Sequence, residues 1–379
     1  MSLLRLICER IKQSHTSGWL EESRGVKHPV SCISFHEYMS LCLYNERFGY
    51  YKSGEPRVGR TGDFYTSSGI GTIMGEVMAS YIREMSIALE GSPIIAEWGG
   101  GTGRLSAQML QRWTLSDCQW MQQLQYWFID DNPVHLAAAV ETLKQFKERI
   151  RIRMMTAGEA LDNIGGETPI IVLANELLDA FPVHRIVMKK GRLLELGVTV
   201  TGEEERLAYC YMPLSDPLIE VSLKRDGVIL AEAQETEVNL EAERWLTDLG
   251  TKIKNGCLVL IDYGDTADEL RASHRMKGTL LCYRRHQAAD DPFQTPGEQD
   301  ITAHVNYSAC RSAAEAAGWS VVYYQTQKQF LVDHGILELL SDYGGSDPFS
   351  PEARRNRAIR QLLLSDGMSE SFKVMVLRK

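Results

Sequence analysis

The sequence lacks a long uninterrupted hydrophobic run. A helix that crosses a bilayer needs ~18 or more consecutive apolar residues, and no stretch of the 379 residues approaches that length. The apolar N-terminal segment MSLLRLICERIKQS is interrupted by charged residues, among them Arg5, Glu9 and Lys12. It therefore has no signal-peptide core and is better explained as a packed amphipathic helix. The sequence predicts a cytoplasmic protein with no membrane insertion.

Paired cysteines and clustered basic residues are also missing. The eight cysteines are scattered, with no C-x-x-C pair and no zinc-like spacing, which predicts reduced thiols and no metal site. The formal net charge is -9, and no run of Lys and Arg could neutralise a line of phosphates. These absences argue against a protein that binds nucleic acid.

What the sequence does have is a regular series of short apolar runs in its larger, C-terminal part. Stretches that read as helices separate most of these runs, and continuous apolar strands alternating with helices are typical of a parallel sheet covered on both faces. The sequence therefore predicts an α/β fold. The runs are IIAEW (94–98), YWFID (126–130), IRIRMM (150–155), IIVLAN (170–175) and CLVLIDY (257–263).

The predicted elements divide the chain into a helical N-terminal part and a larger α/β part. Residues 1–90 are predicted to be mainly helical, and residues 91–379 to form the α/β domain. Insertions into this domain are expected at about 185–250 and 265–306, where strand-like and turn-rich sequence breaks the alternation. The apolar stretch FLVDHGILELL (330–340) is explained as a core helix, with a homodimer interface as the alternative.

A glycine-rich turn follows the first apolar run of the α/β part. The strand ends at Glu97, and Gly99, Gly100, Gly101 and Gly103 precede the helix-forming segment RLSAQML. Ligands of open α/β sheets bind at this carboxyl edge. Glycine permits positive φ and close approach to the backbone, and the next helix offers free N–H groups. The pattern predicts a site for a nucleotide-like ligand, with a tight turn and no ligand as the alternative.

Two carboxylates follow another apolar run. The run IIVLAN ends at Asn175, and Glu176 and Asp179 then lie three positions apart. On a helical turn this spacing would put both carboxylates on one face. Adjacent carboxylates at a ligand edge are costly unless they bind a cation or share a proton. The alternative interpretation is that both are first-turn residues that the helix dipole favours.

These motifs together resemble a known family. The pattern Glu-x-Gly-x-Gly-x-Gly, with Asp130 closing the second strand, resembles class I S-adenosylmethionine-dependent methyltransferases. More specifically, the chain resembles the MidA-type methyltransferases, which include a mitochondrial complex I assembly protein that methylates arginine. The segments that carry this resemblance are YNERFGYY (44–51), GDFYTS (62–67), EWGGGTGRL (97–105), NELLDAFPV (175–183), VLIDYG (259–264), GTLLCYRRH (278–286) and GEQDITAHVNY (297–307).

The resemblance implies the fold and a set of donor-binding residues. It implies a Rossmann-like, mostly parallel sheet with helices on both faces, an antiparallel last strand formed by SFKVMVLRK, and an inserted substrate-side subdomain. The cofactor implied is S-adenosyl-L-methionine, with the N-terminal segment 1–90 covering its site. The residues implied to bind it are Glu97, Gly99, Gly101, Gly103, Asp130 and Asn175, together with Gly62, Asp63 and Thr66 from the N-terminal segment.

The resemblance also implies a protein substrate, the guanidinium of an arginine in a respiratory-complex subunit. Glu176 and Asp179 would then be catalytic: they would hold the guanidinium through paired charge-assisted hydrogen bonds, and Glu176 would accept its proton. His304 and Asn306 are expected on the substrate side.

The chain departs from the family pattern at a few positions. Ser68 and Gly69 stand where the family has Pro-Glu, and Asn306 stands where it usually has Asp. These departures leave other acceptors open, such as a small molecule or another protein side chain. Two rival functions also stay open: an NAD(P)-dependent oxidoreductase that uses the same glycine turn, and a non-catalytic assembly factor that binds S-adenosylmethionine.

Overall fold

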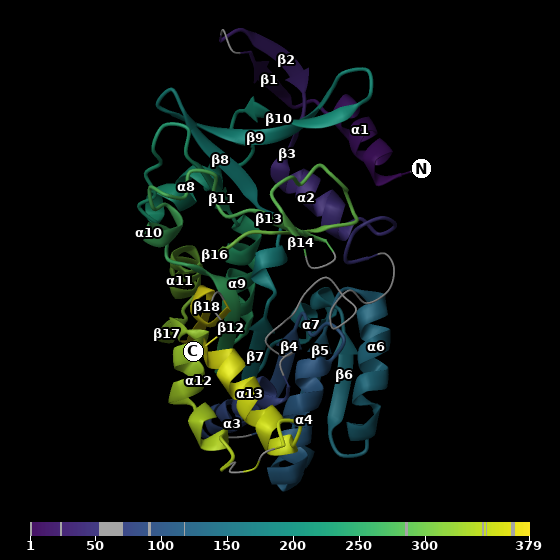
Figure 1. The fold of residues 1–379 in the computed structure, drawn as a ribbon, viewed down its shortest axis with the longest axis vertical. Coiled ribbons are helices and arrows are strands. Elements are labelled where there is room, and N and C mark those ends of the chain that lie inside the picture. The colour runs from purple at the N-terminus through teal and green to yellow at the C-terminus, as the bar shows by residue number, and fades with distance from the viewer. Residues whose placement is uncertain are drawn as a thin grey trace. The chain divides into compact units, whose positions relative to one another are not determined.

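The structure is a computed structural model, shown in Figure 1. It describes residues 2–22, 25–52, 71–89, 92–116, 118–284, 287–342, 345, 347–364 and 368–379. The chain forms two compact units, which are described separately. The first comprises Met1–Gly54, Asp179–Trp245 and Gly264–Ala313, and the second comprises Glu55–Leu178, Leu246–Tyr263 and Ala314–Lys379. None of the described helices is both long and apolar enough to span a bilayer.

The second unit contains the predicted α/β sheet. Strands β4, β5, β6, β7 and β12 are parallel, whereas β18 is antiparallel to both of its neighbours, β12 and β17. All five predicted runs form strands, and the predicted antiparallel last strand is confirmed. The order across the sheet is β17 (Ser320–Thr326), β18 (Phe372–Arg378), β12 (Gly256–Asp265), β7 (Ile170–Asn175), β4 (Ile94–Trp98), β5 (Gln125–Ile129) and β6 (Arg151–Met155).

The central strands of this sheet are buried on both faces, which explains their continuous apolar sequences. On one face, Ile95, Leu173 and Val259 join a core cluster with Met78 and Trp113 of the covering helices. The helices and turns of this unit are α3 (Ile73–Ala88), α4 (Arg104–Ser116), α5 (Cys118–Gln122), α6 (Pro133–Leu143), η2 (Lys144–Phe146), α7 (Ala157–Asn163), most of α9 (Leu240–Lys252), α12 (Gln327–Asp333), η4 (Ile336–Leu339), α13 (Pro351–Leu364) and α14 (Met368–Ser371).

The first unit is built on an antiparallel sheet. The sequence indicated strands in the region 185–250 but did not predict the complete sheet. Its order is β11 (Glu235–Val238), β8 (His184–Lys189), β9 (Arg192–Thr201), β10 (Arg206–Met212), β1 (Ser17–Glu21) and β2 (Lys27–Ser31), and β3 (Ile33–Ser34) pairs with β9. A small sheet has the order β14 (Gln287–Ala289), β13 (Leu281–Arg284) and β15 (Asp300–Thr302), and β16 (Val305–Asn306) pairs with the last residues of β12. The helices are α1 (Leu3–Gln13), α2 (Phe35–Tyr44), α8 (Pro217–Arg225), α10 (Ala267–Leu270) and most of α11 (Tyr307–Ala316).

The N-terminal segment, predicted to be mainly helical, also contains strands. Helices α1, α2 and α3 are present, but residues 17–31 form the hairpin β1–β2, and β1 pairs with β10. The segment is also divided, since α1 and α2 belong to the first unit and α3 to the second. The physical reason is tertiary: a strand from a distant part of the chain supplies the hydrogen bonds that keep this short segment extended.

Candidate active site

The glycine turn between β4 and α4 has the backbone that its sequence predicts. Gly99, Gly101 and Gly103 have φ of 69°, 59° and 77°, in the left-handed region that L side chains rarely adopt. The N–H groups of Gly99 and Gly100 donate to the carbonyl oxygen of Ile129, at 2.8 and 3.3 Å. The turn is therefore fixed to the carboxyl end of β5.

The glycines of the turn differ in what surrounds them. A Cβ at Gly99 would lie 2.8 Å from Leu177 Cδ1, and one at Gly103 would lie 3.3 Å from Ala139 Cβ. At Gly101, by contrast, a Cβ would meet no atom of the described residues within 4 Å. Gly99 and Gly103 thus serve close packing, whereas Gly101 borders open space in which a ligand could approach the backbone.

Asp130, at the end of β5, is held beside this turn. Its carboxylate accepts hydrogen bonds from the backbone N–H groups of Gly101, at 2.9 Å, and Asn132, at 2.8 Å, and His135 Nδ1 lies 3.4 Å from Oδ2. The Asp130 side chain is 10% exposed. A carboxylate has about four acceptor sites, so this one can also receive the hydroxyl groups of a ribose.

The Glu97 side chain is buried beneath the glycine turn. Its Oε2 accepts a hydrogen bond from Tyr126 Oη at 2.6 Å and another from Ser106 Oγ. Burial raises the pKa of Glu97 to about 7, although these two hydrogen bonds oppose the rise. One carboxylate oxygen thus braces β4 against β5 and α4. The predicted contact of Glu97 with a cofactor stays a prediction.

The loop after β7 lies against the glycine turn. Asn175 Nδ2 donates to Glu176 Oε1 at 3.2 Å, whereas Asn175 Oδ1 is buried and has no hydrogen-bond partner in the structure as described. Leu177 packs on Gly99, as the short distance from its Cδ1 indicates. The orphaned amide oxygen therefore belongs to the same edge of the sheet as the glycine turn, where a ligand N–H or O–H group could satisfy it.

The predicted helical arrangement of Glu176 and Asp179 is wrong. Glu176 has φ of 55°, and only Leu178–Ala180 form a single turn of 3₁₀-helix, η3. A left-handed residue cannot continue a right-handed helix, so the two carboxylates do not share a helical face. They also fall in different units, because the boundary lies between Leu178 and Asp179.

Asp262, near the end of β12, is a functional candidate that sequence reasoning missed. It is 2% exposed, and its Oδ2 accepts hydrogen bonds from the backbone N–H groups of Leu177, at 3.1 Å, and Leu178, at 2.9 Å. Its Oδ1 accepts from the N–H of Tyr263 at 2.9 Å. An Asp at the carboxyl end of a buried strand, in VLIDYG, was the available signal.

Asp179 lies in the first unit among residues from several of the family-like segments. Its carbonyl oxygen accepts from the N–H of Ala303 at 3.1 Å, and Tyr44 Oη donates to the next carbonyl, of Ala180, at 2.9 Å. His304 follows Ala303 directly, and its N–H donates to Thr279 Oγ1 at 3.0 Å. The structure therefore brings the backbones of Asp179 and His304 near one another, as a shared site requires.

The same region contains a buried tyrosine and carboxylate pair. Tyr51 Oη donates to Asp300 Oδ2 at 2.7 Å, and the ring of Tyr51 stacks on that of Tyr44, with 5.6 Å between centroids. Burial raises the pKa of Tyr51 well above its usual value, and the charges of Asp300 and Asp179 raise it further. Sequence reasoning quoted both segments but did not single out these two residues.

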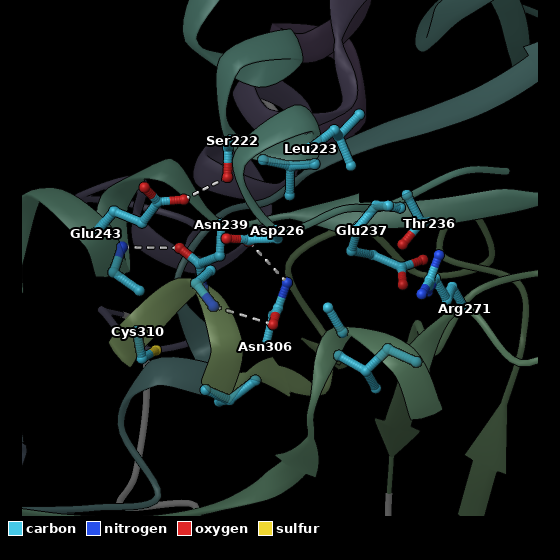
Figure 2. Close-up of a pocket in the computed structure, with 17 residues that line it drawn as sticks. Ser222, Leu223, Asp226, Thr236, Glu237, Asn239, Glu243, Arg271, Asn306 and Cys310 are labelled. Carbon is cyan, nitrogen blue, oxygen red and sulfur yellow. Dashed lines mark hydrogen bonds between the residues drawn. The ribbon is translucent and has the colours of Figure 1, made fainter. Parts of the chain in front are cut away.

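Asn306 has a structural task in the first unit (Figure 2). Its Oδ1 accepts from the N–H groups of Ser308, at 3.0 Å, and Ala309, at 3.1 Å, so Asn306 caps α11. Its Nδ2 donates to Asp226 Oδ2 at 3.4 Å, at a cavity of about 30 Å³. An Asp at this position could cap the helix as well, but it would bring a second carboxylate to Asp226. The predicted substrate-side role of Asn306 stays a prediction.

Some predicted residues lie outside the described part of the chain. Gly62, Asp63 and Thr66, with the departures Ser68 and Gly69, fall within 53–70. Among the residues that the structure describes, no group of three or more His, Cys, Asp or Glu side chains has the arrangement of a metal site.

The residues at the carboxyl edge of the second unit fit a methyl donor that carries a ribose. Gly101 leaves space at the turn, Asp130 offers a carboxylate suited to two hydroxyl groups, and Asn175 has an amide oxygen in need of a donor. These are the hydrogen-bond acceptors that the hydroxyl groups of a ribose and an amino group require.

Comparisons with known proteins agree with this geometry. Residues 75–325 match a protein family described as "Putative S-adenosyl-L-methionine-dependent methyltransferase". A protein from Burkholderia thailandensis, solved with S-adenosyl-homocysteine bound, has 27% sequence identity and a TM-score of 0.85, and the match covers 100% of this chain and 92% of that one. The fold is thus that of class I methyltransferases, with the added antiparallel sheet of the first unit.

Curated relatives are similar over most of their length. Protein arginine methyltransferase NDUFAF7, mitochondrial, of Mus musculus is 27% identical over 83% of this chain and 74% of that protein. The protein of the same name from Danio rerio is 27% identical over 90% of this chain and 82% of that protein.

Proposed function

Because the chain belongs to this family of S-adenosyl-L-methionine-dependent methyltransferases, we propose that it methylates the guanidinium group of an arginine side chain in a protein. S-adenosyl-L-methionine is the cofactor. The observation that carries the proposal is the contact between Leu177 and Gly99. It puts the loop that bears Glu176 directly against the turn that borders the donor space. The names of the curated relatives support arginine as the acceptor.

The protein has to position two reactants and remove one proton. Bound S-adenosyl-L-methionine supplies a methyl group that its sulfonium already activates. Gly101 would leave room for the donor, Asp130 would accept hydrogen bonds from the ribose hydroxyl groups, and Asn175 Oδ1 would accept one from a donor N–H group. Held by these residues, the donor would present its methyl group to the acceptor.

Glu176 acts on the acceptor. Its carboxylate holds the guanidinium by a charge-assisted hydrogen bond and accepts the proton that one nitrogen loses as its bond to the methyl carbon forms and the carbon–sulfur bond breaks. Arginine is protonated in water, so the transfer needs such an acceptor. We assign Asp179 and His304, both in the first unit, to recognition of the substrate, on the sequence pattern.

One alternative has a specific basis. An assembly factor that binds the donor without turnover would keep Gly101 and Asp130 but would not need a carboxylate at position 176. Glu176 has left-handed backbone, which glycine would adopt with less strain. The presence of an acidic residue at this strained position favours the enzyme over the assembly factor.

Two measurements test the proposal. Calorimetric titration with S-adenosyl-L-methionine should give binding that Asp130→Ala and Gly101→Val weaken and Glu176→Gln preserves. Incubation of a cell lysate with the protein and tritiated donor should label methylarginine in protein hydrolysates, at least tenfold less with Glu176→Gln. Donor binding without labelled methylarginine for the wild type would reject arginine as the acceptor. Undiminished labelling with Glu176→Gln would reject the role of Glu176.

A further inference from the structure

The backbone of Glu176 adopts a conformation that its own side chain disfavours. Its φ of 55° lies in the left-handed region, where non-glycine residues are uncommon. Such a conformation persists only where the surroundings impose it, and it is concentrated at functional sites. The structure must therefore contain the group that holds Glu176 in this state.

The neighbouring strand β12 supplies the restraint. The N–H of Glu176 donates to the carbonyl oxygen of Ile261 at 2.8 Å, which extends the parallel ladder between β7 and β12 by one bond. The next two N–H groups, of Leu177 and Leu178, turn away from the ladder and converge on Asp262 Oδ2, at 3.1 and 2.9 Å. The change of direction between these bonds falls on Glu176.

We propose that Asp262 is a positioning residue for methyl transfer, which sets the direction of the Glu176 side chain by imposing left-handed backbone on it. This inference rests on the proposed role of Glu176 as the proton acceptor. Asp262 acts through the loop, by way of the N–H groups of Leu177 and Leu178. Its almost complete burial and its contacts with consecutive backbone N–H groups suit that task.

A carboxylate is required here, and an amide cannot replace it. Oδ2 accepts hydrogen bonds from the N–H groups of Leu177 and Leu178, while Oδ1 accepts one from the N–H of Tyr263 at 2.9 Å. Asn offers a single acceptor oxygen, and its NH₂ group would face a backbone N–H. Asp262→Asn therefore breaks at least one of these bonds with almost no change of volume.

A double-mutant cycle in stability tests the inference without any activity assay. Glu176→Gly relieves the left-handed strain and should raise the thermal midpoint by roughly 1–2 °C. Asp262→Asn should lower the midpoint, and by less when position 176 is Gly than when it is Glu, because Gly needs no restraint there. An equal effect of Asp262→Asn in both backgrounds would overturn the inference.

Glu205→Gly is the matched control. Glu205 also has left-handed backbone, with φ of 52°, but it lies between β9 and β10 in the first unit. This substitution should leave donor affinity and methyl transfer unchanged, and it should not alter the effect of Asp262→Asn on the midpoint. Altered coupling in the control would mean that the cycle reports general stability, and the inference would fail.

Kinetics separate a positioning role from a structural one. Asp262→Asn should keep the Kd for S-adenosyl-L-methionine within about twofold of wild type, with kcat for labelled methylarginine reduced more than tenfold and the KM for the acceptor changed much less. A loss of donor affinity equal to the loss of kcat would contradict the inference. If the wild type labels no arginine, the proposed function fails, and the stability cycle still decides whether Asp262 restrains Glu176.

Discussion

The protonation of Glu97 should make the stability of this protein depend on pH. Its carboxylate is 3% exposed, and Oε2 is bonded to Tyr126 and Ser106. Burial disfavours the charged form and raises the pKa from 4.5 to about 7. Near pH 6 the folded protein therefore retains a proton on Glu97 that the unfolded chain has released. The reference for this effect is the variant Glu97→Gln, whose side chain is uncharged at every pH.

The size of the effect follows from the pKa difference. Each pKa unit corresponds to about 1.4 kcal/mol, so the shift corresponds to about 3 kcal/mol of the free energy of unfolding. The folded-state pKa is raised, so this contribution is fully present below pH 4.5 and declines as pH rises. It is lost once pH passes about 7. The wild type should thus lose about 3 kcal/mol relative to Glu97→Gln between pH 4.5 and pH 8.

Urea unfolding of both proteins at pH 5, 6, 7 and 8 measures this difference. The control is Tyr126→Phe, which removes a hydrogen bond that lowers the pKa of Glu97. In that background the decline should extend to higher pH. A difference between wild type and Glu97→Gln that stays constant from pH 5 to pH 8 would refute the reasoning, because it would mean that Glu97 titrates alike in the folded and unfolded chains.

Three further changes have defined outcomes. Gly101→Ala should cost about 1 kcal/mol of stability through its φ of 59° and weaken donor binding more than tenfold by calorimetry, whereas Gly202→Ala, at φ of 69° and with equally open surroundings, should cost stability alone. Asp130→Asn should weaken donor binding about tenfold and also lower the thermal midpoint, because one amide oxygen can accept from only one of the two N–H groups, of Gly101 and Asn132, that now bond to separate carboxylate oxygens. Asn306→Asp should lower the thermal midpoint, because it replaces the Nδ2 donor that lies 3.4 Å from Asp226 Oδ2 with a second carboxylate oxygen, and Arg225, which is paired with Asp226, offsets only part of the repulsion.

The parallel sheet could be predicted because its central strands are buried on both faces, which leaves continuous apolar runs in the sequence. The hairpin β1–β2 could not, since most of its residues are exposed or half-buried and the partner of β1, β10, lies far along the chain. Because the hairpin has no continuous buried face, its sequence lacks the alternation of apolar and polar residues that predicts a strand.

In the candidate site, too, some features could be predicted from the sequence and others could not. The positions of the glycine turn and Asp130 could be predicted, because each directly follows an apolar run in the sequence, and the two runs form neighbouring strands. The arrangement of Glu176 could not, since the residue that bends its loop, Asp262, comes 85 positions after Leu177. Helical spacing was the natural expectation for Glu176 and Asp179, and a tertiary hydrogen bond overrode it.

The contacts of Asp130 bear on how fast the donor can bind. Gly101, Asn132 and His135 already restrict its carboxylate, so the side chain loses little rotamer entropy when a ribose arrives. The glycine turn is likewise tied to β5 through Ile129. Under the proposed assignment, donor exchange should therefore need little reorganisation of Asp130 and the glycine turn.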